Sequence, residues 1–280
     1  MSLHKVFPDA EALGAALAAE IVTGMADAAV RGRRYLLGCP GGRSLIGTYE
    51  AVAGRLRSAP MDLAHVVIVM MDDYLDDYLD DVPGPARRVP ADALHSCERF
   101  ARLRIAEPWS RAVGPGRGIR EDHVWVPDPG DPPRFDERIA AAGGIDLFLL
   151  ATGASDGHVA FNPPGCGLAE GTRVVRLAES TRRDNLVTFP HFGTLDQVPR
   201  RGVSVGPATI AGLSRRVRLV ATGADKAKSV ARVRAARRWE PDWPATIVHA
   251  SREAEMWTDP AAAAGTTAAE SRSRPRQLDS

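Results

Sequence analysis

Asp156 and His158 are the residues of this chain best placed for chemistry, because they stand two apart in a Gly-bearing segment that follows an apolar run at residues 145–150. That run has the length of a buried strand, so both side chains are expected on the loop at its carboxyl end, where α/β proteins bind ligands. A histidine beside an aspartate can pass a proton to or from a bound molecule. A lone histidine is more often structural, so the pair needs support from elsewhere in the chain.

Asp72 is the second candidate, because it follows the apolar residues 66–69 closely. A carboxylate at the end of a buried strand is partly desolvated by the sheet beneath it, which raises its pKa and suits it to act as a base near neutral pH. An acidic run is more often a solvated face, but position separates Asp72 from the later acids, which stand in a stretch broken by proline and glycine. These later acids are Asp76, Asp77, Asp80 and Asp81.

Anion binding is indicated at two further points. Gly41, Gly42 and Arg43 form a turn before a helix that is predicted to start at Ser44. Backbone N–H groups at such a helix start, together with the Ser44 hydroxyl, can hold a phosphate oxyanion. The alternative is an ordinary turn with Ser44 as the N-cap, which is favoured on these residues alone. Lys226 stands in the first turn of another predicted helix, where a cation opposes the helix dipole unless an anion is bound.

Apolar, strand-like runs alternate with helix-like stretches along most of the chain, which is typical of parallel βαβ units. The sequence therefore predicts one α/β domain over residues 1–259, with a mixed, mostly parallel sheet covered by helices on both faces. Residues 260–280 hold almost no large apolar side chain and are predicted to form a disordered tail. Helices are predicted at 9–30, 44–56, 91–105, 133–142 and 225–237, strands at 35–38, 66–71, 145–150, 173–177, 202–205 and 217–222, and a Pro/Gly-rich connection at 107–132.

The composition excludes several classes of partner. The chain has 280 residues, enough for the core of one large domain, and its 36 Lys and Arg nearly equal its 35 Asp and Glu, which removes the electrostatic case for nucleic acid or an anionic membrane. No apolar run approaches the roughly 20 residues of a membrane span, and no amino-terminal signal pattern is evident, so the expected compartment is the cytoplasm. Three cysteines without metal-ligand spacing support neither a disulfide frame nor a metal site. The expected partner is a small molecule.

The segment from Thr152 to Gly165 closely resembles the signature of the glucosamine-6-phosphate deaminase and 6-phosphogluconolactonase superfamily. The residues at 72–74, Asp-Asp-Tyr, resemble the Asp-Glu-Tyr motif of the deaminases more than the Asp-Glu-Arg motif of the lactonases. Three further segments, at 41–44, 180–185 and 223–227, resemble the family's Gly-Gly-x-[Ser/Thr], Asp-Thr-Arg-x-x-Asn and Gly-x-x-Lys-Ala patterns. The resemblance spans about residues 35–256 and implies the family's three-layer, Rossmann-like α/β fold.

The same resemblance implies an enzyme that interconverts the aldose and ketose forms of an amino-sugar phosphate, with or without deamination and without a cofactor. The substrate would be glucosamine 6-phosphate or a close analogue, and a homo-oligomer would be usual for the deaminase branch. By resemblance, Asp72 moves the proton between C1 and C2 of the open-chain sugar, His158 opens the pyranose ring, and Asp156 orients or assists His158. The phosphate would be held by Gly41, Gly42, Arg43, Ser44, Lys226 and, as a bidentate ligand, Arg182.

Pro163 departs from the family pattern, in which a Glu follows the Phe-Asn pair and tunes the histidine. Its absence deprives His158 of an anionic neighbour, a change able to weaken ring opening. Three interpretations stay open: the isomerase or deaminase, a 6-phosphogluconolactonase-type hydrolase in which His158 activates water, and a non-catalytic sugar-phosphate-binding protein. The motifs at 72–74 and 161–162 favour the first over the second, and Pro163 is the main support for the third.

Overall fold

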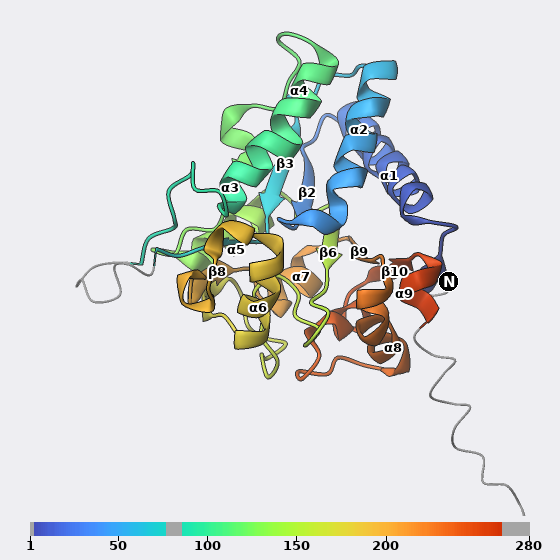
Figure 1. Ribbon diagram of the computed structural model, residues 1–280. Helices are drawn as coiled ribbons and strands as arrows, with labels where there is room; N and C mark the ends of the chain where they lie inside the picture. Colours follow the sequence, from blue (N-terminus) through green and yellow to red (C-terminus); the bar gives the residue numbers. More distant parts are fainter. Residues whose placement is uncertain (1–2, 77–85, 265–280) are drawn as a thin grey trace, which may run out of the picture.

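The computed structural model describes residues 3–76 and 86–264 (Figure 1). Within them, seven parallel strands form the main sheet, in the order β1-β10-β9-β6-β2-β3-β5, and three antiparallel strands, β4-β8-β7, form a second sheet. The strands are β1 (His4–Val6), β2 (Tyr35–Cys39), β3 (Val66–Met70), β4 (Asp72–Tyr74), β5 (Val124–Trp125), β6 (Leu147–Ala151), β7 (Arg173–Arg176), β8 (Arg201–Ser204), β9 (Arg216–Ala221) and β10 (Glu253–Thr258).

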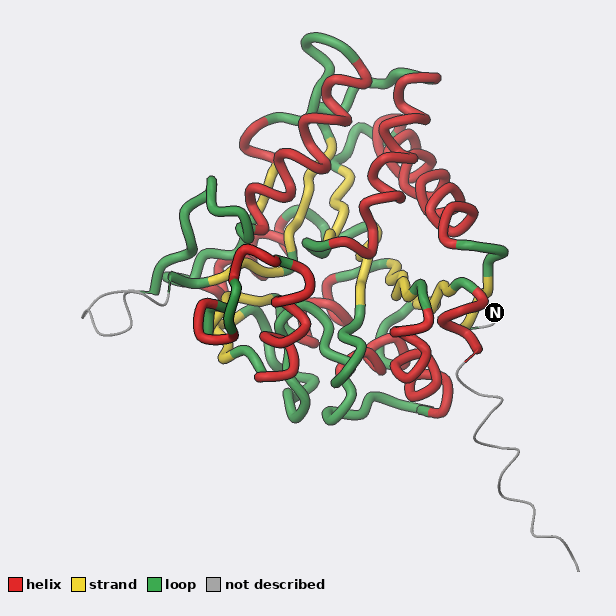
Figure 2. The backbone as a smooth tube through the Cα atoms, in the orientation of Figure 1, coloured by secondary structure: helices red, strands yellow, loops and turns green. Residues whose placement is uncertain are grey.

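The helices pack on both faces of the main sheet, as Figure 2 shows for the strands enclosed between two groups of helices. They are α1 (Ala10–Val30), α2 (Ile46–Ser58), α3 (Cys97–Phe100), α4 (Glu107–Val113), α5 (Pro132–Ala141), α6 (Glu179–Thr188), α7 (Pro207–Leu213), α8 (Ala227–Ala235) and α9 (Pro260–Ala263). This arrangement confirms the predicted α/β class.

Successive side chains of the central strands enter two different cores. In β2, Leu37 packs into the core formed with α1, α2 and α4, whereas Leu36 packs into the core formed with α5, α7 and α8. Ile68 and Val67 divide between the two cores in the same way along β3. Because both faces of these strands are buried, their sequences are continuous apolar runs rather than alternating ones, which is why they could be located from the sequence.

α1 is long and apolar enough to cross a membrane by length and composition, with a mean hydropathy of 1.5 in its most apolar window. We had expected no such segment from the sequence. The helix begins after Asp9, whose side chain accepts a hydrogen bond from the Ala12 N–H at 2.7 Å. Its Leu17 and Ile21 side chains are fully buried in the core beneath the sheet. Such packing is typical of a core helix, which can have the same length and apolar composition as a membrane-spanning helix.

The chain leaves the main sheet for the second sheet at Met71, directly before Asp72. The Met71 N–H donates to the Cys39 carbonyl of β2 at 3.2 Å, and the Met71 carbonyl accepts from the Val205 N–H at 2.8 Å. Asp72 then pairs with Ser204 as the first residue of β4. Asp72 is thus held where the two sheets meet. The strands predicted at 173–177 and 202–205 are present, but they belong to this second sheet rather than to the main one.

Two predicted boundaries were wrong. The helix predicted at 91–105 begins instead at Cys97, after the Ser96 cap, and runs through a π-helical turn (Ala101–Ala106) into α4. Pro108 has no N–H to donate to the preceding turn, and the π-turn stands just before it. The chain therefore stays helical past Pro108 into the predicted connection. The tail predicted from residue 260 begins with α9, in which the Ala262 side chain is fully buried and Asp259 caps the helix. Residues 265–280, and the acids at 77, 80 and 81, lie outside the described residues.

Candidate functional site

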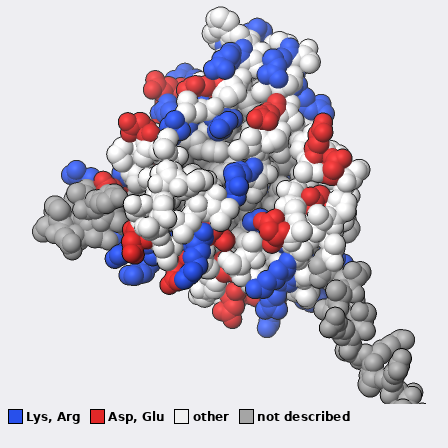
Figure 3. Space-filling model, in the orientation of Figure 1, with Lys and Arg blue, Asp and Glu red and all other residues white. Residues whose placement is uncertain are grey.

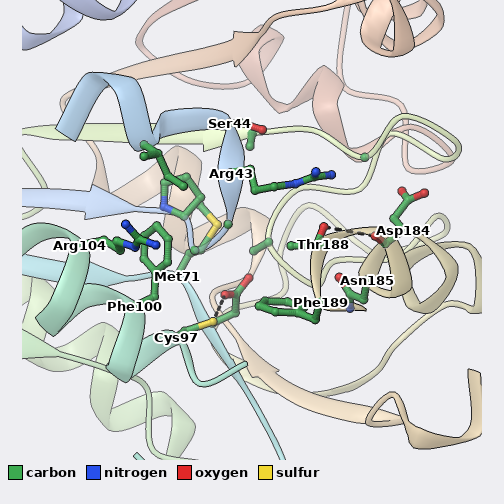
Figure 4. Close-up of a pocket in the computed structure, with 18 of the residues that line it drawn as sticks. Arg43, Ser44, Met71, Cys97, Phe100, Arg104, Asp184, Asn185, Thr188 and Phe189 are labelled. Atoms are coloured by element: carbon green, nitrogen blue, oxygen red, sulfur yellow. Dashed lines mark hydrogen bonds between the residues drawn. The ribbon is translucent and has the colours of Figure 1, made fainter. Parts of the chain in front are cut away.

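The strand order brings the sequence-predicted segments to one edge of the main sheet. β9, β6, β2 and β3 are neighbours in that order, and the residues that follow them carry Lys226, His158, Ser44 and Asp72, respectively. On one side of the boundary between β2 and β6, β2 is followed by β3 and β5; on the other side, β6 is followed by β9 and β10. The direction in which successive strands are added thus reverses at this boundary. Such a switch point is where open α/β sheets bind ligands. A cavity of about 930 Å³ opens there, and all four of these residues line it. Figure 4 shows part of this lining, including Ser44.

Asp72 is buried, with 5% of its surface exposed, yet it lines the cavity. Burial, reinforced by the charge of Asp73, raises the pKa of Asp72 to about 7, against the opposing effects of the Cys97 thiol and of His158. The thiol donates a hydrogen bond to Oδ1 of Asp72 at 3.4 Å. A carboxyl group with this pKa is partly ionised at neutral pH, so it can both accept and return a proton.

Asp73 differs from Asp72 because backbone groups hold its carboxylate. It is fully buried, and its Oδ1 accepts hydrogen bonds from the backbone N–H groups of Tyr74 and Cys97, both at 2.9 Å. Its Oδ2 lies 3.5 Å from the Arg88 guanidinium. Burial raises its pKa to about 6, although these donors and Arg88 favour the charged form. Asp73 is therefore tied to the backbone, whereas Asp72 faces the cavity.

His158 and Asp156 form a hydrogen-bonded pair on the loop after β6. The His158 Nδ1 lies 2.7 Å from Asp156 Oδ1, and Asp156 Oδ2 accepts hydrogen bonds from the hydroxyls of Ser180 and Thr181 at the start of α6. Burial opposes ionisation, but the hydrogen bonds and charge of His158, together with the Ser180 hydroxyl, outweigh it and hold the pKa of Asp156 well below its usual range. The ionised Asp156 thus accepts the Nδ1 proton, which leaves Nε2 of His158 for chemistry in the cavity.

Glycines leave the space that this pair needs. A Cβ atom on Gly153 would lie 2.2 Å from the His158 Nδ1 and 2.7 Å from Asp156 Oδ1. Gly157, at φ +67°, packs against Trp243, where a Cβ would meet the indole at 2.4 Å. Pro163, the departure from the family pattern, is not among the residues that line the cavity. His158 therefore keeps an anionic neighbour, Asp156, without a Glu at position 163.

The turn after β2 carries the residues that the sequence predicts to bind a phosphate group. Gly42 has φ +99°, and the backbone then forms a 3-10 turn, Arg43–Leu45, before α2. Neither the turn nor α2 has a side-chain cap, so Ser44 is not the N-cap of the alternative interpretation, and its exposed hydroxyl lines the cavity. Arg43 lines the cavity too, and no side-chain hydrogen bond or ion pair engages it within the described part of the chain (Figure 4).

Lys226 completes this end of the cavity from the other side of the switch point. Its Nζ donates to the Thr152 carbonyl at 3.0 Å and lies 3.7 Å from Asp225 Oδ2. It is the last residue of a 3-10 turn (Ala224–Lys226) that leads into α8, close to the predicted position. Basic side chains also reach the hollow in the middle of the face shown in Figure 3, among interspersed acids.

Arg182, which the sequence predicts to be a bidentate phosphate ligand, lies outside this arrangement. Its guanidinium donates to the backbone carbonyls of Leu195 and of Val198, the latter at 3.1 Å, and it does not line the cavity. The same helix, α6, instead presents Asp184 and Asn185 to the cavity. Sequence reasoning assigned these two no role, although they stand in the segment that resembles the family motif.

Cys97 is a further lining residue to which sequence reasoning assigned no role. It starts α3 and touches both acids of β4, and no spacing pattern pointed to it. Among residues 3–76 and 86–264, no group of three or more His, Cys, Asp and Glu side chains is arranged to hold a metal ion.

Comparison with known proteins gives consistent relatives. A glucosamine-6-phosphate deaminase of Streptomyces avermitilis is 35% identical over 232 residues, which cover 81% of this chain and 78% of that protein. One of Beutenbergia cavernae is 32% identical over 258 residues, covering 92% and 90%. No family model matches the chain.

Solved structures share the fold. A monomeric glucosamine-6-phosphate deaminase superposes with a TM-score of 0.79 at 22% identity, over 94% of this chain and 100% of that one. A 6-phosphogluconolactonase from Shewanella baltica superposes with a TM-score of 0.64 at 17% identity, over 92% of this chain and 98% of that one.

Proposed function

The chain belongs to the glucosamine-6-phosphate deaminase family, and from that premise we propose that it converts glucosamine 6-phosphate, or a close analogue, from the amino-aldose to the ketose with release of ammonia. One observation carries the proposal. Asp72 and His158, the latter held by Asp156, reach a single cavity from the ends of β3 and β6, with the turn after β2 between them. A buried carboxyl group with a pKa of about 7 and a carboxylate-held imidazole are the two acid–base groups that the reaction needs.

Ring opening is assigned to His158. In the pyranose, the proton on the C1 hydroxyl must leave and one must reach the ring oxygen as the C1–O5 bond breaks. Nε2 of His158 can take the first proton and deliver it to O5, while Asp156 stabilises the imidazolium that forms between the two transfers. The cycle returns His158 to its starting state and leaves an open-chain aldehyde.

Isomerisation is assigned to Asp72. The ionised carboxylate removes the proton from C2 of the aldehyde, and the carboxyl group returns it to C1. One proton also reaches O1 and one leaves the amino nitrogen, so that C1 becomes a CH₂OH group and C2 an imine. Water then adds to C2 and ammonia leaves, which yields the ketose phosphate. A base whose pKa is about 7 both accepts and releases this proton without a large thermodynamic penalty.

Phosphate binding is assigned to the backbone N–H groups of the turn at Gly41 and Gly42, the side chains of Arg43 and Ser44, and Lys226 across the switch point. The turn leads into a helix start, which favours an anion. Arg43 has no other ionic partner within the described residues, so its guanidinium is available to a ligand. With Arg182 engaged by carbonyl groups, Arg43 is the guanidinium that can pair with the phosphate.

Product analysis tests this function directly. The protein is incubated with glucosamine 6-phosphate, and ammonia and ketose phosphate are both assayed, with 6-phosphogluconolactone hydrolysis measured in parallel. The proposal expects equal amounts of ammonia and ketose phosphate. Ketose without ammonia would limit the activity to isomerisation, and lactone hydrolysis without either product would show that the chain uses its fold as a lactonase. The same assay is applied to the variant Asp72→Asn, which removes the proposed base. Its matched control is Asp27→Asn, because Asp27 is an exposed acid of α1.

A further inference from the structure

Cys97 lies between the two acids of β4 and the anion-binding turn. Its thiol donates to Oδ1 of Asp72 at 3.4 Å, and its backbone N–H donates to Oδ1 of Asp73 at 2.9 Å. On its other side it touches the turn, since a Cβ atom on Gly41 would lie 3.2 Å from the sulfur. Cys97 is 5% exposed, and its hydrogen bond to Asp72 is drawn in Figure 4. The residue thus links the base, its neighbouring acid and the turn.

The thiol distinguishes the two oxygens of the Asp72 carboxyl group. Oδ1 accepts the S–H hydrogen, whereas Oδ2 has no hydrogen-bond partner among the described residues. Since Asp72 lines the cavity, Oδ2 is the oxygen left for the substrate proton. Burial and the adjacent acids hold the pKa of the Cys97 thiol well above its usual value, so the group remains a hydrogen-bond donor and not a nucleophile.

We propose that Cys97 is a positioning residue for the proposed reaction: its S–H group fixes the rotation of the Asp72 carboxyl group and leaves Oδ2 to exchange the proton with C2 and C1. The role rests on the proposed function, but the hydrogen bond itself does not. A donor to the ionised carboxylate also favours that form, so removing it raises the pH at which the base becomes active. The other groups that face Asp72 are Asp73 on the same strand and His158 from the loop after β6.

Kinetics of three variants test the role. Cys97→Ala removes the donor, Cys97→Ser keeps one, and Cys166→Ser is the matched control, because Cys166 is buried away from Asp72. For Cys97→Ala we expect about ten-fold lower kcat, a KM within about two-fold of wild type, and an acidic limb of the kcat/KM profile moved up by about one pH unit, the effect of losing one hydrogen bond to a charged group. Cys97→Ser should recover most of both changes. Lower kcat with an unmoved limb, or no recovery in Cys97→Ser, would show that Cys97 only fills space.

Infrared spectroscopy tests the hydrogen bond without any activity. The S–H stretching band of Cys97 is the band that Cys97→Ser lacks and Cys166→Ser keeps. It should move to lower frequency as the pH rises through about 7, because a carboxylate accepts more strongly than a carboxyl group, and Asp72→Asn should abolish that movement. A band that does not respond to pH or to Asp72→Asn would overturn the proposal. If wild-type protein produced neither ketose nor ammonia, the proposed function would fail while this measurement still decided the contact.

Discussion

Asp72→Asn should abolish turnover and at the same time stabilise the protein above neutral pH. The pKa of Asp72 rises from 3.8 in its unperturbed state to about 7 in the folded protein, chiefly through burial. The folded state therefore binds this proton more tightly than the unfolded chain, so the contribution of Asp72 to stability is complete below about pH 4 and is lost as the pH rises to about 7. Three pKa units correspond to about 4 kcal/mol, which is the largest increase in the free energy of unfolding that a neutral side chain at this position can give.

The gain in the free energy of unfolding of Asp72→Asn should be about half of this limit, about 2 kcal/mol, because the amide brings its own N–H group into the buried site. For a protein of this size that is a rise in Tm of about 4 to 8 °C at pH near 8. Urea unfolding and thermal melts of wild type, Asp72→Asn and the exposed control Asp27→Asn, repeated near pH 4 and pH 8, measure the difference. The gain should vanish near pH 4. A variant that is equally destabilised at both pH values, or that keeps wild-type turnover, would refute the assignment of Asp72 as a desolvated base.

Five further substitutions, which include two paired comparisons, separate the parts of the site. Gly153→Ala places a Cβ 2.2 Å from the imidazole and should lower kcat by about a hundred-fold, whereas Gly212→Ala, with nothing within 4 Å, should leave activity unchanged; equal effects would contradict the packing argument. Arg43→Gln should raise the KM for a phosphorylated substrate by about ten-fold, whereas Arg182→Gln should leave KM unchanged and cost about 1–3 kcal/mol in urea unfolding, because two carbonyls lose their donor; the reverse pattern would restore the original assignment. Pro163→Glu should change kcat by less than about two-fold, and a large gain would show that the imidazole needs the family's acid.

The sequence contained enough to place the strand ends but not the side chains around them. Buried parallel strands are unbroken apolar runs, and the polar residues that follow each run must meet at one edge of the sheet, so Asp72 and His158 could be located together. The side-chain partner of Arg182 could not be predicted, because a motif gives a residue's place on its helix, not the partner of its side chain. The partner here is the backbone at Leu195 and Val198, whose conformation no local pattern specifies.

The contact of Cys97 with Asp72 and the bounds of the helix that begins at Cys97 could not be predicted either. Cys97 is 25 residues from Asp72 along the chain, and their contact depends on where α3 begins after an irregular segment. The helix itself was displaced in the prediction: it was expected at 91–105, but it begins at Cys97 and continues through a π-turn into α4. Helix ends and long-range side-chain contacts are decided by tertiary packing, whereas strand cores are decided by composition.

Pro163 gains a different meaning once the loop is seen in three dimensions. The sequence suggested that the missing Glu deprives His158 of an anionic neighbour, which was the main support for a non-catalytic sugar-phosphate-binding protein. The structure places the Asp156 carboxylate 2.7 Å from the His158 Nδ1 and holds it there with hydroxyls from Ser180 and Thr181. An imidazole needs one fixed carboxylate to set its tautomer and to stabilise its charged form, and Asp156 meets that requirement. The departure at Pro163 therefore leaves in place the carboxylate that the proposed ring opening needs.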